Sequence, residues 1–487
     1  MGSIKKLASQ TAVYGLSTIV GRFLNVMLVP LYTRVFNEAE FGVNVTLYAY
    51  ISFFNILLTH GMETAFFRFA EKNDYKKAYS TSFISVLGVS LVFGLLMLFF
   101  GNYISYALGY SSQKIFIWLS AGILIADALC AIPFALLRHL NKPFRFALIK
   151  NLNIGINIFI NVYILLLAPY IKNTYQIQLP FFNPNPGVQY IFIANLIASL
   201  ATLFLLIPEL IKLTLKFDTE FWKTMIKYAV PMAVVGFAGM INETLDRIML
   251  GFYSPDTVTA NTVTGIYGAV YKLSIIISVF IQAFKFAAEP FFFSHAKQSD
   301  KRDIYATVMN YFVIVCLTIF LVVMLYLNYI KYFLGEKFHS GLHVVPILLM
   351  ANICLGIYYN LSVWYKLSDN TLKGAQISIV GAAITIVANA ILIPKLSYTG
   401  CAIATLICYF SMMVISFIWG NKYYPIPYNV TKIISYFGFA IAAYAVFVFL
   451  VEPNIYSYYI KNTIAFLLIA SFAVYAFIKE KALNLIK

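Results

Sequence analysis

The sequence predicts an all-α integral membrane protein with fourteen transmembrane helices. Its 487 residues are 61% hydrophobic and only 11% charged, with a mean hydropathy of +0.81. Soluble chains carry about 25% charged residues, so this composition indicates a membrane environment. Fourteen apolar stretches recur along the chain, and the polar gaps between them alternate between rich and poor in Lys and Arg.

Each apolar stretch has about the length that crosses a bilayer. A hydrocarbon core about 30 Å thick takes roughly 20 residues of helix. The predicted spans, in order, are 8–35, 42–62, 80–102, 115–137, 146–169, 188–211, 228–252, 265–290, 305–330, 342–365, 375–394, 400–420, 433–451 and 462–478.

The distribution of basic residues predicts that both termini are cytoplasmic. With the N-terminus inside, the cytoplasmic gaps and the termini carry 24 Lys and Arg residues, and the outer gaps carry 7. Basic residues concentrate in the cytoplasmic loops of membrane proteins. We therefore interpret the formal net charge of +16 as contact with anionic membrane lipids, and we expect no nucleic-acid partner.

The gaps between spans are too short to hold a catalytic domain. The longest outer gap runs from about Tyr170 to Gly187. The five cysteines all fall within spans, and neither they nor the histidines have disulfide or metal-ligand spacing. We expect no catalytic residues, no metal and no cofactor. A channel, a transporter or an integral-membrane enzyme remains open, and a receptor with a soluble sensor is excluded.

Charged residues inside four of the spans are the candidate functional residues. A charge at the bilayer centre costs about 2.5–3.5 kcal/mol on insertion scales, so such a residue faces protein or water. The basic candidates are Arg22, Arg247, Lys272 and Lys285, and the acidic candidates are Asp127, Glu243 and Asp246.

Arg22 and Lys272 have no carboxylate at i±3 or i±4 in their own spans, so we interpret them as lining a cavity. At a helix rise of about 1.5 Å per residue, Arg22 and Asp127 reach similar depths near the middle of the membrane. Asp127 is therefore a candidate either to bind a coupling ion or to balance the charge of Arg22.

The other candidates also have a structural interpretation. Glu243 and Asp246 lie beside Arg247 in span 7, where an ion-pair cluster would lock this span to span 8. The same two carboxylates are candidates for ion coupling. Lys285 lies near the inner boundary of span 8, from where its ammonium group can snorkel to the headgroups.

Spans 1–2 and spans 7–8 have similar sequences, which predicts an internal repeat. The two segments read GRFLNVMLVPLYTRVFNEAEFGVNVTLYAYIS and INETLDRIMLGFYSPDTVTANTVTGIYGAVYKLSIIIS. Two six-span units would share one orientation and enclose a binding site between them. The predicted domains are an N-lobe over 1–215, a C-lobe over 216–425 and a helix pair, spans 13–14, over 426–487.

The chain resembles the polysaccharide-biosynthesis flippases of the multidrug/oligosaccharidyl-lipid/polysaccharide exporter superfamily. The resemblance rests on GRFLNVMLVPLYTRVFNEAEFG, PMAVVGFAGMINETLDRIMLGFY and YGAVYKLSIIISVFIQAFKFAAEPFFFSHA, and covers essentially the whole chain. It implies two six-helix lobes, related by a pseudo-two-fold axis, around a cavity that opens to each side in turn. Spans 13–14 would help to form a groove for a polyprenyl tail.

The resemblance also implies a function. The chain would be a flippase and not an enzyme, moving a polyprenyl-pyrophosphate-linked oligosaccharide to the outer leaflet of the bacterial cytoplasmic (inner) membrane for O-antigen or capsule synthesis. Basic cavity residues would hold the pyrophosphate, with Arg22 and Lys272 the best matches by position, followed by Arg247 and Lys285. A Na⁺ or H⁺ gradient would drive transport, and a polysaccharide polymerase and glycosyltransferases would be further partners.

Three alternatives stay open. A lipid II flippase shares the expected features. A drug or cation antiporter of the same superfamily typically has a carboxylate within span 1, where this chain has Arg22 instead. A polyprenyl-dependent membrane glycosyltransferase or ligase generally needs a large outer loop or acidic residues near the outer face.

Overall fold

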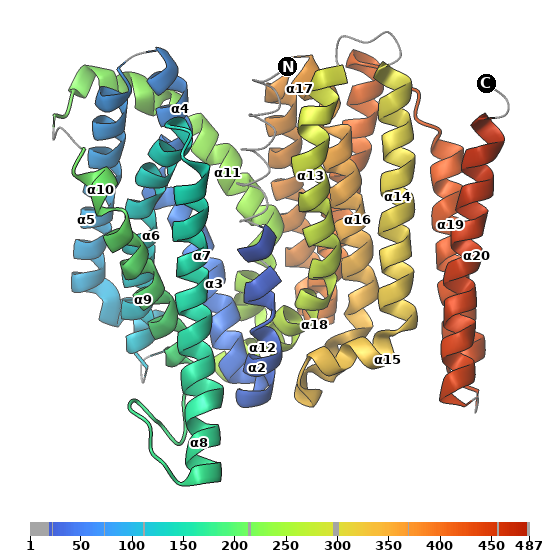
Figure 1. Cartoon of the computed structure of the whole chain (residues 1–487), viewed down its shortest axis with the longest axis horizontal. Helices are drawn as coiled ribbons and strands as arrows, with labels where there is room; N and C mark the ends of the chain where they lie inside the picture. Colours follow the sequence, from blue (N-terminus) through green and yellow to red (C-terminus); the bar gives the residue numbers. More distant parts are fainter. Residues whose placement is uncertain are drawn as a thin grey trace. The chain divides into compact units, whose positions relative to one another are not determined.

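The protein is an all-helical, multi-pass membrane protein in the part that the computed structural model describes. The described residues are 19–21, 23–72, 74–110, 113–212, 216–295, 301–368, 370–454 and 457–484, and every regular element within them is helical (Figure 1). Within these ranges, eleven helical segments are long and apolar enough to cross a membrane, and α9 (Gln189–Leu205) is apolar but shorter.

The described helices agree with the predicted all-α membrane fold. They do not establish that the chain has fourteen transmembrane spans. The first part of the first predicted span, 8–35, lies outside the described residues, which begin at position 19. The predicted spans 375–394 and 400–420 belong to α18 (Thr371–Tyr423), in which Ser397 has non-helical backbone angles. The predicted span 265–290 is interrupted by a 3₁₀ turn at Lys272–Ser274.

Two compact units contain these helices. The first unit, within Met1–Gly268 and Asn389–Tyr398, contains α2 (Val29–Val35), α3 (Glu38–Thr59), α4 (Met62–Lys72), α5 (Tyr75–Ala107), α6 (Ile115–His139), α7 (Pro143–Val162), α8 (Ala168–Tyr175), α9, α10 (Ile207–Leu210), α11 (Thr219–Tyr253) and most of α12 (Thr257–Tyr271). The second unit, within Ala269–Ala388 and Thr399–Lys487, contains α13 (Ile275–His295), α14 (Lys301–Leu325), α15 (Leu327–Ile330), α16 (Val345–Leu361), α17 (Val363–Leu367), most of α18, α19 (Val430–Val446) and α20 (Tyr458–Asn484). The predicted N-lobe and C-lobe rest on a repeat in the sequence. The division into these two units does not test that repeat, so the lobes stay a prediction.

Side chains at helix starts explain where several helices of the first unit begin. Asn37 and Glu40 form a reciprocal capping box at the start of α3. Asp218 accepts a hydrogen bond from the Phe221 amide at the start of α11, and its Oδ2 lies 2.7 Å from Lys77 Nζ of α5. The Lys77 ammonium and the Phe221 amide hold the pKa of Asp218 below its ordinary value.

Glycines allow three helices of the first unit to approach closely. A Cβ on Gly42 of α3 would overlap the Asn261 carbonyl of α12, and a Cβ on Gly265 of α12 would overlap the Glu38 carbonyl of α3. Gly61, with φ +76°, follows α3 and lies against the Ala229 carbonyl of α11. Small residues are what permits such backbone contact between membrane helices.

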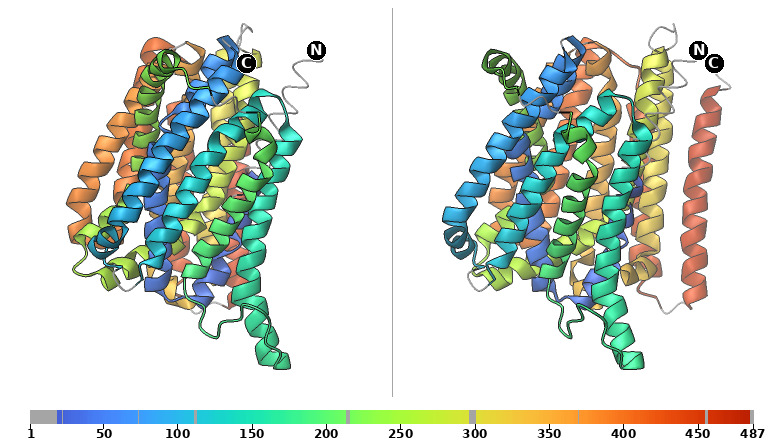
Figure 2. Two further views of the ribbon diagram at one scale, coloured as in Figure 1. Left: turned by 90° about the vertical axis from the view of Figure 1, so that its left-hand side faces the viewer. Right: turned by 60° about the vertical axis from the view of Figure 1, so that its left-hand side comes forward.

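Helix α8 continues α7 past the ends of its neighbours α6 and α9 within the same unit (Figures 1 and 2). A π-helical turn at Tyr163–Leu167 joins the two helices. The predicted outer gap after Tyr170 therefore begins as helix, which ends at Tyr175.

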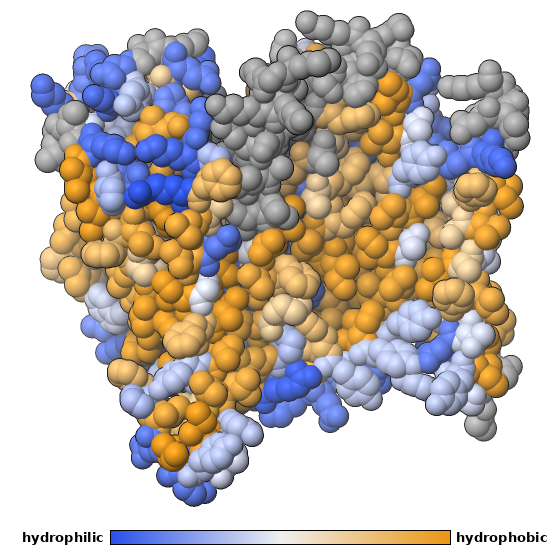
Figure 3. Space-filling view, viewed as in Figure 1, coloured by the Kyte–Doolittle hydropathy of each residue, from blue (hydrophilic) through white to orange (hydrophobic). Residues whose placement is uncertain are grey.

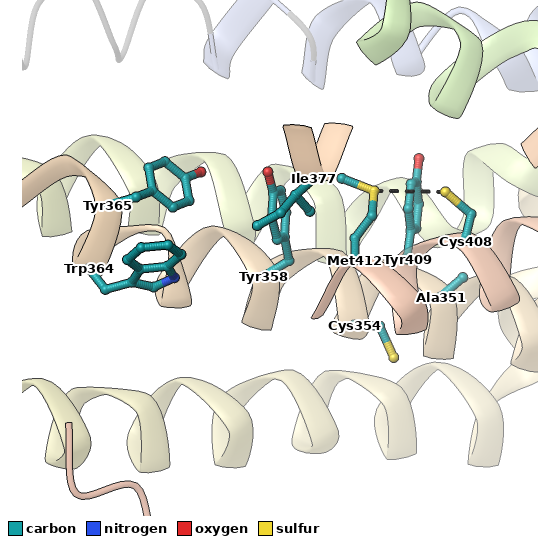
Figure 4. Packing of buried hydrophobic residues seen from close by; sticks show 9 residues of the cluster. All are labelled: Ala351, Cys354, Tyr358, Trp364, Tyr365, Ile377, Cys408, Tyr409 and Met412. Carbon is teal, nitrogen blue, oxygen red and sulfur yellow. Dashed lines mark hydrogen bonds between the residues drawn. The ribbon is translucent and has the colours of Figure 1, made fainter. Parts of the chain in front are cut away.

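The core of the second unit is aromatic and sulfur-rich (Figure 4). Trp364 is 1% exposed, and its indole N–H donates to Ser416 Oγ at 3.2 Å. The thiol of Cys408 lies 3.8 Å from Met412 Sδ within the same cluster. All five cysteines of the chain are buried free thiols, and a buried free cysteine packs as a small apolar side chain.

Helices α19 and α20 pack side by side through a buried ion pair. Lys432 Nζ lies 2.8 Å from Glu480 Oε1, with the two side chains 5% and 13% exposed. The Tyr436 hydroxyl donates to the same oxygen at 2.7 Å. The ring of Phe439 stacks on Tyr475 at 4.8 Å between centroids.

Hydrophobic residues cover the middle of the helices on the face shown in Figure 3, and hydrophilic residues gather at the helix ends. Large apolar side chains such as Phe99 and Phe449 are 78% and 75% exposed. Water penalises such exposure and lipid does not. This surface is that of a protein embedded in a bilayer.

Candidate functional site

The structure describes six of the seven charged residues predicted inside spans. Arg22 lies outside the described residues. Asp127, Glu243, Asp246 and Arg247 lie in the first unit, and Lys272 and Lys285 lie in the second.

Asp246 and Arg247 form a buried ion pair in α11. Arg247 Nη1 lies 3.2 Å from Asp246 Oδ1, and the two side chains are 10% and 5% exposed. Arg247 also donates to the backbone carbonyl of Glu243, whose own side chain is exposed. The Glu243 side chain therefore lies on the exposed side of α11. The ion pair that we predict between its carboxylate and Arg247 stays a prediction.

Tyr267 joins this ion pair to the next helix. Its hydroxyl donates to Asp246 Oδ2 at 2.7 Å, and its ring centroid lies 5.8 Å from the Arg247 guanidinium carbon. Tyr267 belongs to α12 and is fully buried. We call Asp246, Arg247 and Tyr267 the charge cluster. Its contacts link the predicted spans 7 and 8, and nothing in the sequence singles out Tyr267 among 36 tyrosines.

Asp127 lies in a polar network of three helices. The Ser199 hydroxyl of α9 donates to Asp127 Oδ1 of α6 at 2.7 Å and lies 3.5 Å from Asn195 Oδ1. Asn195 Nδ2 donates in turn to the hydroxyl of Tyr48 in α3. We call Tyr48, Asp127, Asn195 and Ser199 the polar network. A charge inside a bilayer is tolerated where it is paired, hydrogen-bonded or hydrated, and Ser199 supplies a hydrogen bond to Asp127 here.

Lys150 is a cation near Asp127 that is not among the predicted candidates. It lies in the second turn of α7, within electrostatic range of Asp127. Its Nζ lies 4.3 Å from the centroid of the Phe134 ring. The sequence offered a partial signal, because Lys150 falls inside the apolar stretch 146–169.

Helix α3 lies between the two groups of polar residues in the first unit. Tyr48 joins the polar network, while Ala49 and Phe53 pack against Ile248 of α11, the residue after Arg247. Adjacent residues of one helix therefore face Asp127 on one side and α11 on the other. A movement of α3 would therefore disturb the contacts of Tyr48 in the polar network and the packing against Ile248 of α11.

Lys272 stands where helix α12 gives way to α13. It is half-buried and opens the 3₁₀ turn Lys272–Ser274. Asn352 of α16 accepts from Ser278 at 2.9 Å and lies 3.4 Å from Ser274 Oγ. A helix break beside buried polar groups and a lysine is unusual in an apolar span, and such breaks often mark functional positions.

Lys285 lies in a small groove of the second unit with a second lysine. Its Nζ lies 4.8 Å from the centroid of Tyr359, and the groove between α13 and α16–α17 is also lined by Phe292 and Lys366. Lys285 is exposed, as snorkelling requires. Lys366 directly follows the predicted span 342–365 and is not among the predicted candidates.

Two groups of described residues therefore come together within the first unit, the charge cluster and the polar network. Lys272 and Lys285 occupy different levels of the second unit, at the start and in the middle of α13. The role of each residue in transport stays a prediction. Among the described residues, no group of His, Cys, Asp and Glu has the arrangement of a metal site.

Solved structures with the same fold are transport proteins by their titles. A structure of the lipid II flippase MurJ in an inward closed conformation matches 97% of this chain and 99% of its own, with a TM-score of 0.68 and 16% identity. An inward-facing multidrug resistance MATE family transporter of the MOP superfamily covers 85% of this chain and 97% of its own, with a TM-score of 0.61 and 13% identity. A MOP superfamily transporter from Pyrococcus furiosus covers 86% and 94%, with a TM-score of 0.57 and 12% identity.

These likenesses show that the chain has the fold of MOP superfamily transporters and of a flippase, and they offer no support for an enzyme. A search of curated proteins found no sequence relative. The family model described as polysaccharide biosynthesis protein matches residues 7–296. Because this match spans more than half of the chain, the protein belongs to the polysaccharide biosynthesis protein family.

Proposed function

We propose that this protein is a flippase that moves a polyprenyl-pyrophosphate-linked oligosaccharide across the bacterial cytoplasmic membrane by alternating access. The observation that carries the proposal is the set of charged side chains inside apolar helices, in a chain of this family with the fold of flippases and transporters. Both termini would lie in the cytoplasm, and the substrate would move from the cytoplasmic to the outer leaflet for O-antigen or capsule synthesis.

The physical problem explains the need for internal charge. A polyprenyl tail can remain in hydrocarbon, but a diphosphate and sugars cannot cross it unaided, because desolvating a charge is costly. Cationic side chains in a hydrated path lower that barrier. Arg22 and Lys272 are the residues to which we assign the diphosphate, with Lys285 beside Lys366 as a further cationic position. Arg247 is already paired with Asp246 and is assigned to linking helices.

Asp127 is the best candidate for coupling to a Na⁺ or H⁺ gradient. It is half-buried, it is held by Ser199, and Lys150 lies within electrostatic range. A proton or sodium ion on Asp127 would change the local charge beside α3, which also packs against Ile248 of α11, the residue after Arg247. Ion binding and helix movement would in this way be linked. Glu243 and Asp246 stay secondary candidates.

Reconstitution distinguishes this function from its rivals. The purified chain is placed in liposomes that contain a fluorescent polyprenyl-diphosphate oligosaccharide, and protection from an added membrane-impermeant quencher reports the leaflet. Faster redistribution than in protein-free liposomes supports the proposal. Redistribution of lipid II alone would favour a lipid II flippase, and uptake of a cationic drug alone would favour an antiporter, as the titles of the similar structures suggest for those proteins. The assay contains no polysaccharide polymerase or glycosyltransferase, so it measures the activity of this chain alone.

A further inference from the structure

A pocket of about 590 Å³ lies wholly within the first unit, and none of the charged residues discussed above is among its described lining residues. It is formed by the C-terminal ends of α5 and α11, the N-terminal end of α12 and one face of α3. These helix ends are the predicted outer ends of their spans. We call it the outer pocket; its lining includes Tyr50, Tyr106, Tyr110, Ile248, Asp256 and Asn261. Its volume is in the range of small-molecule sites.

Glycines fix the walls of the outer pocket. Gly109, with φ +77°, turns the chain after α5 so closely that a Cβ there would overlap Thr257 at the start of α12. The crossing of Gly42 and Gly265 holds α12 against α3 on the other side. The pocket is thus shaped by backbone contacts, which leave little freedom to collapse.

Hydrogen bonds pre-orient its polar groups. The Tyr110 hydroxyl donates to Asn261 Oδ1 at 3.0 Å, and the Ser105 hydroxyl donates to the Tyr110 carbonyl at 2.7 Å. Tyr110 and Asn261 are 5% and 8% exposed. With its oxygen engaged, Asn261 has its amide N–H groups as the remaining donors. A buried and oriented amide at a pocket wall is typical of polar ligand recognition.

The chemistry of the lining selects the class of ligand. None of its described lining residues is basic, and Asp256 contributes a carboxylate, so a diphosphate would be repelled. The rings of Tyr50 and Tyr106 offer apolar faces, and hydroxyl and amide groups offer neutral hydrogen bonds. A sugar has C–H faces that pack on aromatic rings and hydroxyls that both donate and accept. We propose that the outer pocket binds a saccharide, namely the neutral sugar portion of the lipid-linked substrate near the outer side. This inference rests on the proposed function.

A photocrosslinking experiment in cells that make the polysaccharide tests this proposal. The residue p-benzoylphenylalanine replaces Tyr106, which is 73% exposed and lines the pocket. The matched control carries it at Phe99, which is 78% exposed on the same helix and is not among the lining residues. After irradiation of the full-length protein, mass spectrometry of the adducts distinguishes hexose-containing groups from phospholipid.

We expect saccharide adducts at position 106 and not at position 99. Adding Asn261→Ala to the Tyr106 probe should lower the saccharide adduct about tenfold, as expected for one lost hydrogen bond. Tyr110→Phe, which keeps the ring, should lower it about threefold and serves if Asn261→Ala does not fold. Phospholipid adducts alone at position 106, or equal saccharide yields at both positions, would overturn the proposal, as would the absence of any saccharide adduct.

Deletion of the whole chain separates this inference from the proposed function. If surface polysaccharide does not depend on the chain, the flippase assignment fails. If surface polysaccharide depends on the chain and position 106 captures only phospholipid, the flippase assignment stands and the saccharide pocket is refuted.

Discussion

Replacing Arg247 with alanine should destabilise the protein strongly while leaving transport per folded molecule near normal. The substitution leaves the Asp246 carboxylate, 5% exposed, with the Tyr267 hydroxyl but without the guanidinium 3.2 Å away. Removing one partner of a buried ion pair costs about 3–5 kcal/mol. The control is Lys223→Ala on the same helix, where the ion pair with Glu220 is exposed and is worth about 0–1 kcal/mol.

The free energy of unfolding is measured by titration of the detergent-solubilised protein with SDS. The triple variant Asp246→Leu, Arg247→Met and Tyr267→Phe removes every member of the charge cluster together. Replacing a buried ion pair by apolar groups of similar volume is often neutral, so this variant should recover most of the loss. Normal stability of Arg247→Ala combined with abolished transport would refute the reasoning, because that pattern belongs to a residue that contacts the ligand.

Three other predictions address topology, the cationic residues and coupling. Single cysteines at Thr174 and Glu220 of a Cys-free variant should label from the outside and the inside respectively, and the opposite pattern would reverse the orientation. Arg22→Ala or Lys272→Ala should abolish surface polysaccharide at near-normal protein levels. Arg22→Lys should keep part of the activity, because lysine keeps the charge without the bidentate geometry. Full activity of the double alanine variant would remove both residues from the substrate path. Asp127→Asn should fold normally and lose the response of liposome transport to an imposed Na⁺ or H⁺ gradient, whereas an unchanged response would exclude Asp127 from coupling.

The helices were predictable because each apolar stretch carries its own signal. The short gap at 395–399 between two predicted spans coincides with the non-helical residue Ser397 in α18. The break at Lys272 was not predictable, since the residues around it include neither proline nor an adjacent glycine. At this break Ser274 and Ser278 contact Asn352 of α16, far along the chain, and the Ser274 hydroxyl also donates to the Tyr271 carbonyl at 2.7 Å.

The candidate site was predictable in its charges but not in their partners. Asp246 and Arg247 stand out because charge is rare in these spans, and they do form an ion pair. Ser199 and Tyr267 carry no such signal, because serine and tyrosine are common in membrane helices. Their importance arises only when packing brings them to a carboxylate. Lys150 is not among the predicted candidates, because a basic residue near the start of an apolar stretch is typical of the membrane boundary.

The ion pair between α19 and α20 has a consequence for biosynthesis. When α19 leaves the ribosome and reaches the membrane, Lys432 has not yet met Glu480, which is made 48 residues later. Until α20 arrives, that ammonium group has to stay near water, so the first turn of α19 cannot take its final position. The two helices therefore mature as a hairpin. A protein that stops before Glu480 would keep that ammonium group near water, so α19 would not reach the position that it has beside α20.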